Sequence, residues 1–296
     1  MKKQHTNHQS ANVETCKITV SIVMPVYNAA NTVAFAIHSI IVQQFVNWEL
    51  IVLDDGSTDN TSQIVSSFKD SRIRLINCNH DFISTLNRGF LEAKGEYIAR
   101  MDADDLMAPE RLKVQVEILN RDKKIDICSS WITFFGDGIP NSIYGSLYGK
   151  VREPILKLLE KNYFCHPTAM IRHSFWVNNN IQYREYKHAE DYELWFQMAK
   201  LGAIFYVEAQ PLLYYRISNQ QISNKYFLEQ QKTSYEIKWE IIEYLINCHK
   251  EKDHIFQLFI LQRHLVKKGI MPIDVVIQQF ITIFNRLKSQ NSIYIN

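Results

Sequence analysis

The sequence lacks several features that would point to particular classes of protein. Its five cysteines are scattered and no two are spaced C-x-x-C, so neither a cysteine-rich zinc site nor a disulfide framework is predicted. No apolar run approaches the roughly 20 residues of a membrane-spanning helix. The formal net charge of +2 lacks the basic excess of a dedicated nucleic-acid binder. We therefore expect a protein of the reducing cytosol with no nucleic-acid partner.

Three regions differ in composition. Residues 1–17 are polar and lack the apolar segment of a secretion signal, which predicts a disordered N-terminal tail. Residues 18–223 alternate between β-branched runs and amphipathic stretches, which favours an α/β domain. Residues 224–296 contain almost no glycine or proline before Gly269 and Pro272, and helix-forming residues dominate. This last region is predicted to be a helical C-terminal extension.

The α/β region begins with a regular alternation of elements. Strands are predicted at residues 18–24, 49–53, 72–76 and 96–99, and helices occupy the stretches between them. Short turns in this order predict a mostly parallel, mixed sheet flanked by helices. Further strands are predicted at residues 125–135, 164–171 and 212–216, with helices at 155–162 and 192–201.

Acidic turns follow two of the predicted strands. Asp54 and Asp55 follow the second strand, and Asp102, Asp104 and Asp105 follow the fourth, just before a helix start predicted at residues 106–111. The carboxyl ends of parallel strands share one edge of a sheet, where ligands bind in open α/β folds. Carboxylates suit Mg²⁺ or Mn²⁺ shared with phosphates. The alternative is that each turn is solvated and only caps the next helix.

The C-terminal extension has an apolar stripe at helical spacing. Val276, Phe280, Phe284 and Leu287 lie on one face, and Asp274 is a predicted helix cap. One interpretation is that two or three helices pack on the α/β region or on each other. A second is that basic amphipathic helices contact the surface of the inner membrane. A homodimer contact through these helices is a third.

Several ordered motifs carry a resemblance to a known family. They are MPVYNA at residues 24–29, ELIVLDDGSTD at 49–59, NRG at 87–89, AKGEYI at 93–98, DADD at 102–105, His166-Pro167 and Glu190-Asp191. In this order and spacing, residues 18–223 resemble the inverting glycosyltransferases of family 2, which have the GT-A fold. The resemblance implies an enzyme that moves one sugar from a nucleotide-sugar, usually a UDP-sugar, with one divalent metal, Mn²⁺ or Mg²⁺.

The resemblance also implies roles for the residues that bind the donor. Pro25 and Tyr27 would flank the uracil, and Asp55 would accept a hydrogen bond from the uracil N–H. Asp102 would lie near the ribose, and Asp104 would contact the metal. Such a metal neutralises the charge that grows on the leaving diphosphate.

Asp191 would be the catalytic base of the family. It would take the proton of the acceptor hydroxyl, and a single displacement would turn an α-linked donor into a β-linked product. Neighbouring Glu190 would help to keep Asp191 basic. Without the resemblance, the favoured interpretation of Asp191 is a carboxylate stabilised by the dipole of a helix start. His166 is either a site residue or a satisfied buried histidine, and Arg88 or Arg100 would contact the diphosphate.

Two departures and two alternatives accompany this interpretation. Many relatives carry histidine where this chain has Ser218, and arginine where it has Leu86. The Gln-x-x-Arg-Trp motif of processive synthases is also absent. We therefore expect transfer of a single sugar to a saccharide or lipid-linked oligosaccharide, in lipopolysaccharide or capsule synthesis. A sugar nucleotidyltransferase would need a glycine-rich loop after the first strand, and none is present before Gly56. A non-catalytic scaffold with the same fold is the other alternative.

Overall fold

The computed structural model describes residues 18–136, 138–218, 225–249 and 252–289. The predicted N-terminal tail and the predicted boundary at residues 223 and 224 lie outside these ranges. The strands are β1 (Val20–Val26), β2 (Trp48–Asp54), β3 (Ile73–Asn77), β4 (Tyr97–Arg100), β5 (Leu106–Met107), β6 (Ile127–Phe135), β7 (Ser142–Tyr144), β8 (Gly149–Lys150), β9 (Met170–Arg172) and β10 (Phe205–Arg216).

The helices follow in the same way along the chain. They are α1 (Val33–Ile41), α2 (Thr61–Ser67), α3 (Phe82–Glu92), α4 (Arg111–Arg121), α5 (Pro154–Glu160), the 3₁₀ helix η1 (His166–Thr168), α6 (His173–Asn178), α7 (Glu190–Lys200), α9 (Phe227–Asn247), α10 (Lys252–Lys267) and α11 (Ile273–Ser289).

One mixed sheet organises the α/β region. Its strand order is β3-β2-β1-β4-β9-β6-β10-β5, with β7 and β8 paired to β6 and β10. Strands β3, β2, β1 and β4 are parallel, whereas β9 runs antiparallel to β4 and β6. Strands β6 and β10 are parallel to each other. The predicted α/β class with a mostly parallel, mixed sheet is confirmed.

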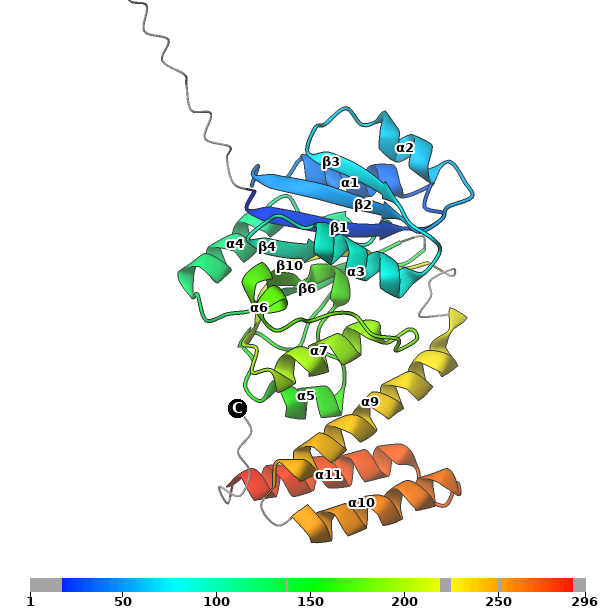
Figure 1. Ribbon diagram of the computed structural model, residues 1–296, viewed down its shortest axis with the longest axis vertical. Coiled ribbons are helices and arrows are strands. Elements are labelled where there is room, and N and C mark those ends of the chain that lie inside the picture. Colours follow the sequence, from blue (N-terminus) through cyan, green and yellow to red (C-terminus); the bar gives the residue numbers. More distant parts are fainter. Residues whose placement is uncertain (1–17, 137, 219–224, 250–251, 290–296) are drawn as a thin grey trace, which may run out of the picture.

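Side chains of β1 alternate between two cores, which is why its sequence is apolar throughout. Ile22 and Met24 pack into one core with helices α1 and α4, while Val23 packs into the other with α3 and α7. Helices therefore cover both faces of the sheet (Figure 1).

The C-terminal helices continue the second core. Ile237 and Ile241 of α9 and Phe280 and Phe284 of α11 are fully buried in the same cluster as Trp195 of α7. Figure 1 shows α9 running from beside α7 to the α10–α11 pair. The apolar stripe predicted in this region thus packs against the α/β region and within the helix group, as the first of the three interpretations expected.

Three predicted elements were wrong in detail. Residues 106–107 form strand β5 because Leu106 and Met107 pair with β10, and α4 begins only at Arg111. Residues 164–171 do not form one strand, because Pro167 has no N–H for a ladder and lies in η1 instead. The strand predicted at 212–216 is longer and begins at Phe205, with an irregular register around Pro211.

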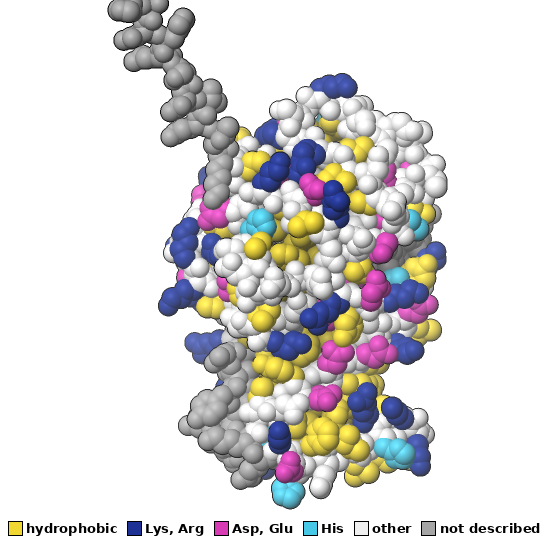
Figure 2. All heavy atoms as spheres, viewed as in Figure 1, with side chains coloured by type: hydrophobic (Ala, Val, Ile, Leu, Met, Phe, Trp, Pro, Cys, Tyr) yellow, Lys and Arg dark blue, Asp and Glu magenta, His cyan; other side chains and the backbone are white. Residues whose placement is uncertain are grey.

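The surface carries mixed charge. On the face shown in Figure 2, basic and acidic side chains are interspersed, and hydrophobic side chains gather over the C-terminal helices at the bottom. Within the described ranges, no helix is both long and apolar enough to cross a membrane.

Candidate functional site

The two acidic turns meet at one edge of the sheet, as predicted. Strand β1 pairs with β2 and β4, so that Val26 lies beside Asp54 and Val23 beside Arg100. The turns after β2 and β4 therefore flank the carboxyl end of β1. This placement follows from parallel pairing and from the aligned starts of the three strands, since Val20 lies beside both Trp48 and Tyr97.

Asp55 is a buried carboxylate that fixes the turn after β3. Its Oδ1 accepts hydrogen bonds from the Asp81 N–H (2.9 Å) and the Thr85 hydroxyl (2.6 Å). Its own N–H donates to the carbonyl of Val26 (2.8 Å). Asp55 thus joins the ends of β1 and β2 to the start of α3.

Tyr27 and His80 form an aromatic pair beside Asp55. Tyr27 follows β1 and is half exposed, and its ring stacks on that of His80 at a centroid distance of 4.3 Å. His80 Nδ1 lies 2.9 Å from the Asp55 carbonyl oxygen and 3.5 Å from its carboxylate. Pro25 is buried in β1. Sequence reasoning missed His80, although it follows the third strand at the same sheet edge.

Arg100 is a buried cation at the end of β4. It is 3% exposed, and its guanidinium Nη1 lies 2.6 Å from the Asp102 carboxylate. Its carbonyl oxygen accepts a hydrogen bond from buried Arg111 (2.8 Å). Within the described part of the chain, the Arg100 Nε is buried without a hydrogen-bond partner. Arg100 therefore has a donor that a bound anion could use.

The turn after β4 is held by the end of β10. Arg216 Nε donates to the Asp104 carbonyl (2.7 Å), and the Arg216 N–H donates to Asp105 Oδ1 (2.8 Å). Burial and the nearby charge of Asp102 raise the pKa of Asp104 to about 6. The same two causes raise the pKa of Asp105 well above its ordinary value. Crowded carboxylates of this kind are relieved by a cation.

This acidic turn fits one divalent cation shared with phosphates. Among the described residues, no three His, Cys, Asp or Glu side chains are grouped as a complete metal site. Mg²⁺ is commonly held by one or two carboxylates, with substrate phosphates supplying further ligands. Asp104 is partly exposed, and the buried Asp105 Oδ2 has no hydrogen-bond partner in the described structure. The residues present therefore suit a metal that arrives with a diphosphate.

Asp191 lies in the first turn of α7 and has both oxygens hydrogen-bonded. Asn162 Nδ2 donates to Oδ2 (3.0 Å), and the Tyr192 N–H donates to Oδ1 (2.7 Å). The Asn162 Oδ1 accepts from the Phe164 N–H (3.2 Å), so the amide nitrogen faces Asp191. Burial raises the pKa of Asp191 to about 6, and the hydrogen bond from Asn162 lowers it.

Burial shifts the pKa of two further predicted residues. Burial and the charge of Asp191 raise the pKa of Glu190 to about 7. His166 is buried and lies 2.8 Å from the Tyr183 hydroxyl, and burial followed by the charge of Arg100 holds its pKa well below the usual range. Asn87 fixes Tyr183 through both backbone groups, at 2.9 and 2.8 Å. No pattern in the sequence indicated Asn162, Tyr183 or this role of Asn87.

The two arginines predicted to contact the diphosphate lie in different places. Arg100 lies near enough to Asp104, Glu190 and Asp191 for its charge to lower the pKa of each. Arg88 instead lies on the outer face of α3, where its guanidinium is half exposed and pairs with Glu92 at 2.7 Å. Of the two candidate diphosphate contacts, only Arg100 lies among the acids.

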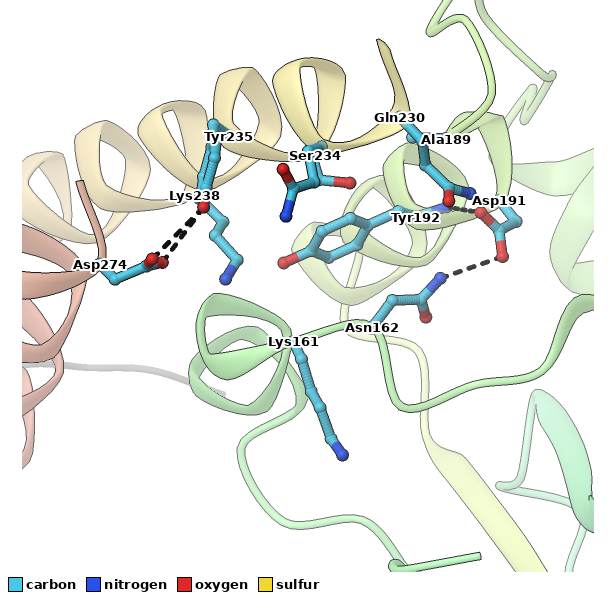
Figure 3. Close-up of a pocket in the computed structure, with 11 residues that line it drawn as sticks. Lys161, Asn162, Ala189, Asp191, Tyr192, Gln230, Ser234, Tyr235, Lys238 and Asp274 are labelled. Carbon is cyan, nitrogen blue, oxygen red and sulfur yellow. Dashed lines mark hydrogen bonds between the residues drawn. The ribbon is translucent and has the colours of Figure 1, made fainter. Parts of the chain in front are cut away.

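A pocket of about 330 Å³ opens beside Asp191, on the side of the C-terminal helices (Figure 3). Its walls come from α9, from the start of α7, from the segment after α5 and from α11. The lining residues are Lys161, Asn162, Ala189, Asp191, Tyr192, Gln230, Gln231, Ser234, Tyr235, Lys238 and Asp274. A carboxylate with a raised pKa in such a pocket is typical of a functional site.

Comparison with known sequences identifies relatives. Residues 21–178, just over half of the chain, match the family model Glycosyl transferase family 2. An uncharacterized glycosyltransferase of Haemophilus influenzae is 33% identical over 79% of this chain and 76% of its own length. WfgD of Escherichia coli, a UDP-Glc:α-D-GlcNAc-diphosphoundecaprenol β-1,3-glucosyltransferase, is 29% identical over 75% of this chain and 85% of its own.

Comparison with solved structures gives the same fold. The crystal structure of S. aureus TarS 1–349 has a TM-score of 0.61 and 25% identity, and the match covers 84% of this chain and 72% of that one. The same protein in complex with UDP-GlcNAc matches with a TM-score of 0.61 at 22% identity.

Proposed function

The chain belongs to glycosyl transferase family 2, as its motifs predicted, and from this premise we propose that it moves one sugar from a UDP-sugar to a hydroxyl of a saccharide or lipid-linked acceptor. The observation that carries the proposal is the position of buried Arg100. It pairs with Asp102 of the acidic turn after β4 and lies near enough to Asp191 of α7 for its charge to lower the pKa of that carboxyl. The residues proposed to bind the donor and the residue proposed as the base would then lie around one buried cation.

A uridine nucleotide is the donor class that the relatives favour. The printed name of WfgD gives UDP-Glc as its donor, and TarS has been crystallised with UDP and with UDP-GlcNAc. In this chain, Tyr27 offers an exposed ring for a base to stack on, and Pro25 lies two residues before it. We assign the uracil N–H to Asp55, whose Oδ2 faces His80 at 3.5 Å. Asp102 would lie near the ribose.

The diphosphate would meet the acidic turn and Arg100. Asp104 would hold Mn²⁺ or Mg²⁺, with Asp102 close by, and a bound divalent cation neutralises charge on a leaving diphosphate. Arg100 is the better suited of the two arginine candidates, because its unpartnered Nε can donate to a phosphate oxygen. Arg88 is less suited, since Glu92 already occupies it.

Asp191 would act as the general base. As the acceptor oxygen attacks the anomeric carbon, the bond to the diphosphate breaks and the hydroxyl proton passes to a carboxylate oxygen of Asp191. Attack from the opposite face inverts the configuration, so an α-linked donor gives a β-linked product. Asn162 and the Tyr192 N–H hold the carboxylate in place. Glu190 precedes the base and its charge would help to keep Asp191 protonatable, and His166 would act near the acceptor.

The acceptor class is proposed from the relatives. WfgD acts on a sugar linked through diphosphate to a lipid, and TuaG of Bacillus subtilis, 25% identical over 80% of this chain, is named as a candidate teichuronic acid biosynthesis enzyme. Both names belong to bacterial surface polysaccharides. We propose the same setting here, with lipopolysaccharide or capsule as the product.

The alternatives receive less support. Family membership favours a glycosyltransferase over a sugar nucleotidyltransferase, and a scaffold would have no need of an ordered base. Location in the cytoplasm agrees with the free thiols of Cys78, Cys128, Cys165 and Cys248. Peripheral contact with the inner membrane, or a homodimer, remains a proposal for the C-terminal helices.

Donor binding and hydrolysis test this proposal directly. A panel of UDP-sugars would be measured with and without Mn²⁺ on wild type, on Asp104→Ala and on the exposed control Asp253→Ala. We expect one UDP-sugar to be hydrolysed in a metal-dependent way by wild type and by Asp253→Ala, and the metal dependence to be lost in Asp104→Ala. NMR of a glycoside product would then give the anomeric configuration.

Two results would contradict it. Metal-independent hydrolysis by wild type would contradict the proposed metal and the proposed role of Asp104, but not the proposed donor. If no UDP-, GDP- or dTDP-sugar is bound, the scaffold alternative is favoured.

A further inference from the structure

The pocket beside Asp191 is closed on one side by a helix outside the segment that matches the family model. We propose that α9 forms a wall of the acceptor site, and that the pocket binds one neutral sugar residue next to the attacking hydroxyl. The proposal rests on the proposed function, because it takes Asp191 as the base.

Polar groups without protein partners face this pocket. Exposed Gln231 and half-buried Ser234 of α9 line it, and among the described residues neither side chain is hydrogen-bonded to the protein. An amide and a hydroxyl both donate and accept, and they match the hydroxyl groups of a sugar. Asn162 and Asp191 lie on the opposite side (Figure 3). A sugar between these walls could present its hydroxyl to Asp191.

The size and the aromatic lining agree with a sugar. A volume of about 330 Å³ lies at the small end of the range for small-molecule sites. Tyr192 and Tyr235 contribute rings to the lining, and the Tyr192 hydroxyl is already engaged by the Leu158 carbonyl. Tyr192 is almost fully buried, so the partly exposed ring of Tyr235 offers the apolar surface against which the C–H face of a sugar can pack.

The charges favour a neutral ligand. Lys161 and Lys238 are balanced by Asp191 and Asp274 around the same space. Lys238 also donates to the Glu160 carbonyl (3.0 Å). The pocket thus has no excess of positive charge to hold a phosphate, so we place any acceptor diphosphate outside it.

Helix α9 is fixed to the segment that precedes the base. Gln230 Nε2 donates to the His188 carbonyl (2.8 Å), and the Tyr186 hydroxyl donates to Glu240 (2.7 Å). The rings of His188 and Tyr226 stack at 4.3 Å. A wall held in this way keeps a constant distance from Asp191, as the selection of an acceptor requires.

Blocking the pocket from α9 tests the inference. Ser234→Trp and the smaller Ser234→Leu would be compared with Glu236→Trp, which is exposed on the same helix. Acceptors would be a synthetic α-GlcNAc-diphosphate on a short alkyl chain and a set of neutral hexosides, with the UDP-sugar that wild type hydrolyses. Donor hydrolysis without acceptor reports on the donor site alone.

We expect the Ser234 variants to raise the KM for the acceptor by about tenfold or more, as a steric mismatch in a substrate pocket does. Glu236→Trp should match wild type. Transfer by both Ser234 variants with unchanged acceptor KM would overturn the inference, and so would a wild type that hydrolyses its donor but glycosylates no sugar tested. If no donor is bound or hydrolysed, the proposed function itself fails, which is a separate outcome.

Discussion

The candidate site has two ends that are built in different ways. One end lies at the turns after β1, β2 and β3, and the other lies at the start of α7. The first end consists of turns that directly follow parallel strands, and Asp55 links them through hydrogen bonds to neighbouring turns. The second end assembles Asp191 from α7, Asn162 from the segment after α5 and a wall from α9. One end depends on the edge of a sheet, and the other on the packing of helices distant in sequence.

This difference predicts a division of labour. Changes at the β1–β3 end should affect donor affinity, because those residues face the proposed nucleotide. Changes at the α7 end should affect turnover, its pH dependence or acceptor use. Arg100 lies between the two ends and should affect both.

The largest effect is expected for Asp191→Asn. Loss of the base should lower kcat by about 10²–10⁴-fold and leave the donor KM unchanged. Steady-state kinetics with varied UDP-sugar would measure both, with Asp253→Asn as control. A loss below tenfold would place the base elsewhere, with Glu190 as the next candidate.

Arg100→Met should lower the free energy of unfolding. Removing this buried cation leaves Asp102, Glu190 and Asp191 uncompensated, which costs about 3–5 kcal/mol. Urea denaturation at pH 8 would measure the change. Arg88→Met is the matched control, because its pair with Glu92 is exposed and screened by solvent and therefore contributes little to stability. Equal effects of the two variants would contradict the central position of Arg100.

Asp55→Ala should weaken binding of the donor and leave catalysis by Asp191 unchanged. The substitution removes the acceptor of two hydrogen bonds that hold Asp81 and Thr85. If the whole loss falls on the donor complex, the free energy of donor binding weakens by about 1–3 kcal/mol. The donor KM should therefore rise while kcat changes little. The double variant with Asp191→Asn should show additive free energies. Strong coupling between the two would show that the ends are not separate.

Asn162→Ala should shift the pH dependence of kcat. A base works when it is ionised, so activity rises as the pH passes the pKa of Asp191, near 6. Asn162 stabilises the ionised form, and its loss should raise that pKa and move the acidic limb upward by about one pH unit. Exposed Asn285→Ala should leave the profile unchanged. An unmoved limb in Asn162→Ala would show that its hydrogen bond does not tune the base.

The sequence by itself determined the sheet and one end of the site. Strands with unbroken apolar runs must be buried on both faces, and the residues that follow parallel strands must share an edge, so Asp55, Asp102 and Asp104 could be placed in advance. The family motifs added Asp191. Each of these inferences depends on local pattern or on strand pairing between near neighbours.

Only the tertiary structure decided the rest. Asn162 reaches Asp191 across 29 positions, Asn87 reaches Tyr183 across 96, and Gln230 reaches His188 across 42. Arg100 and Arg88 were equal candidates in the sequence, and folding buried one and left the other on an exposed helix face. Hydrogen bonds and burial at such separations depend on how helices pack on the sheet, and no local periodicity encodes that packing.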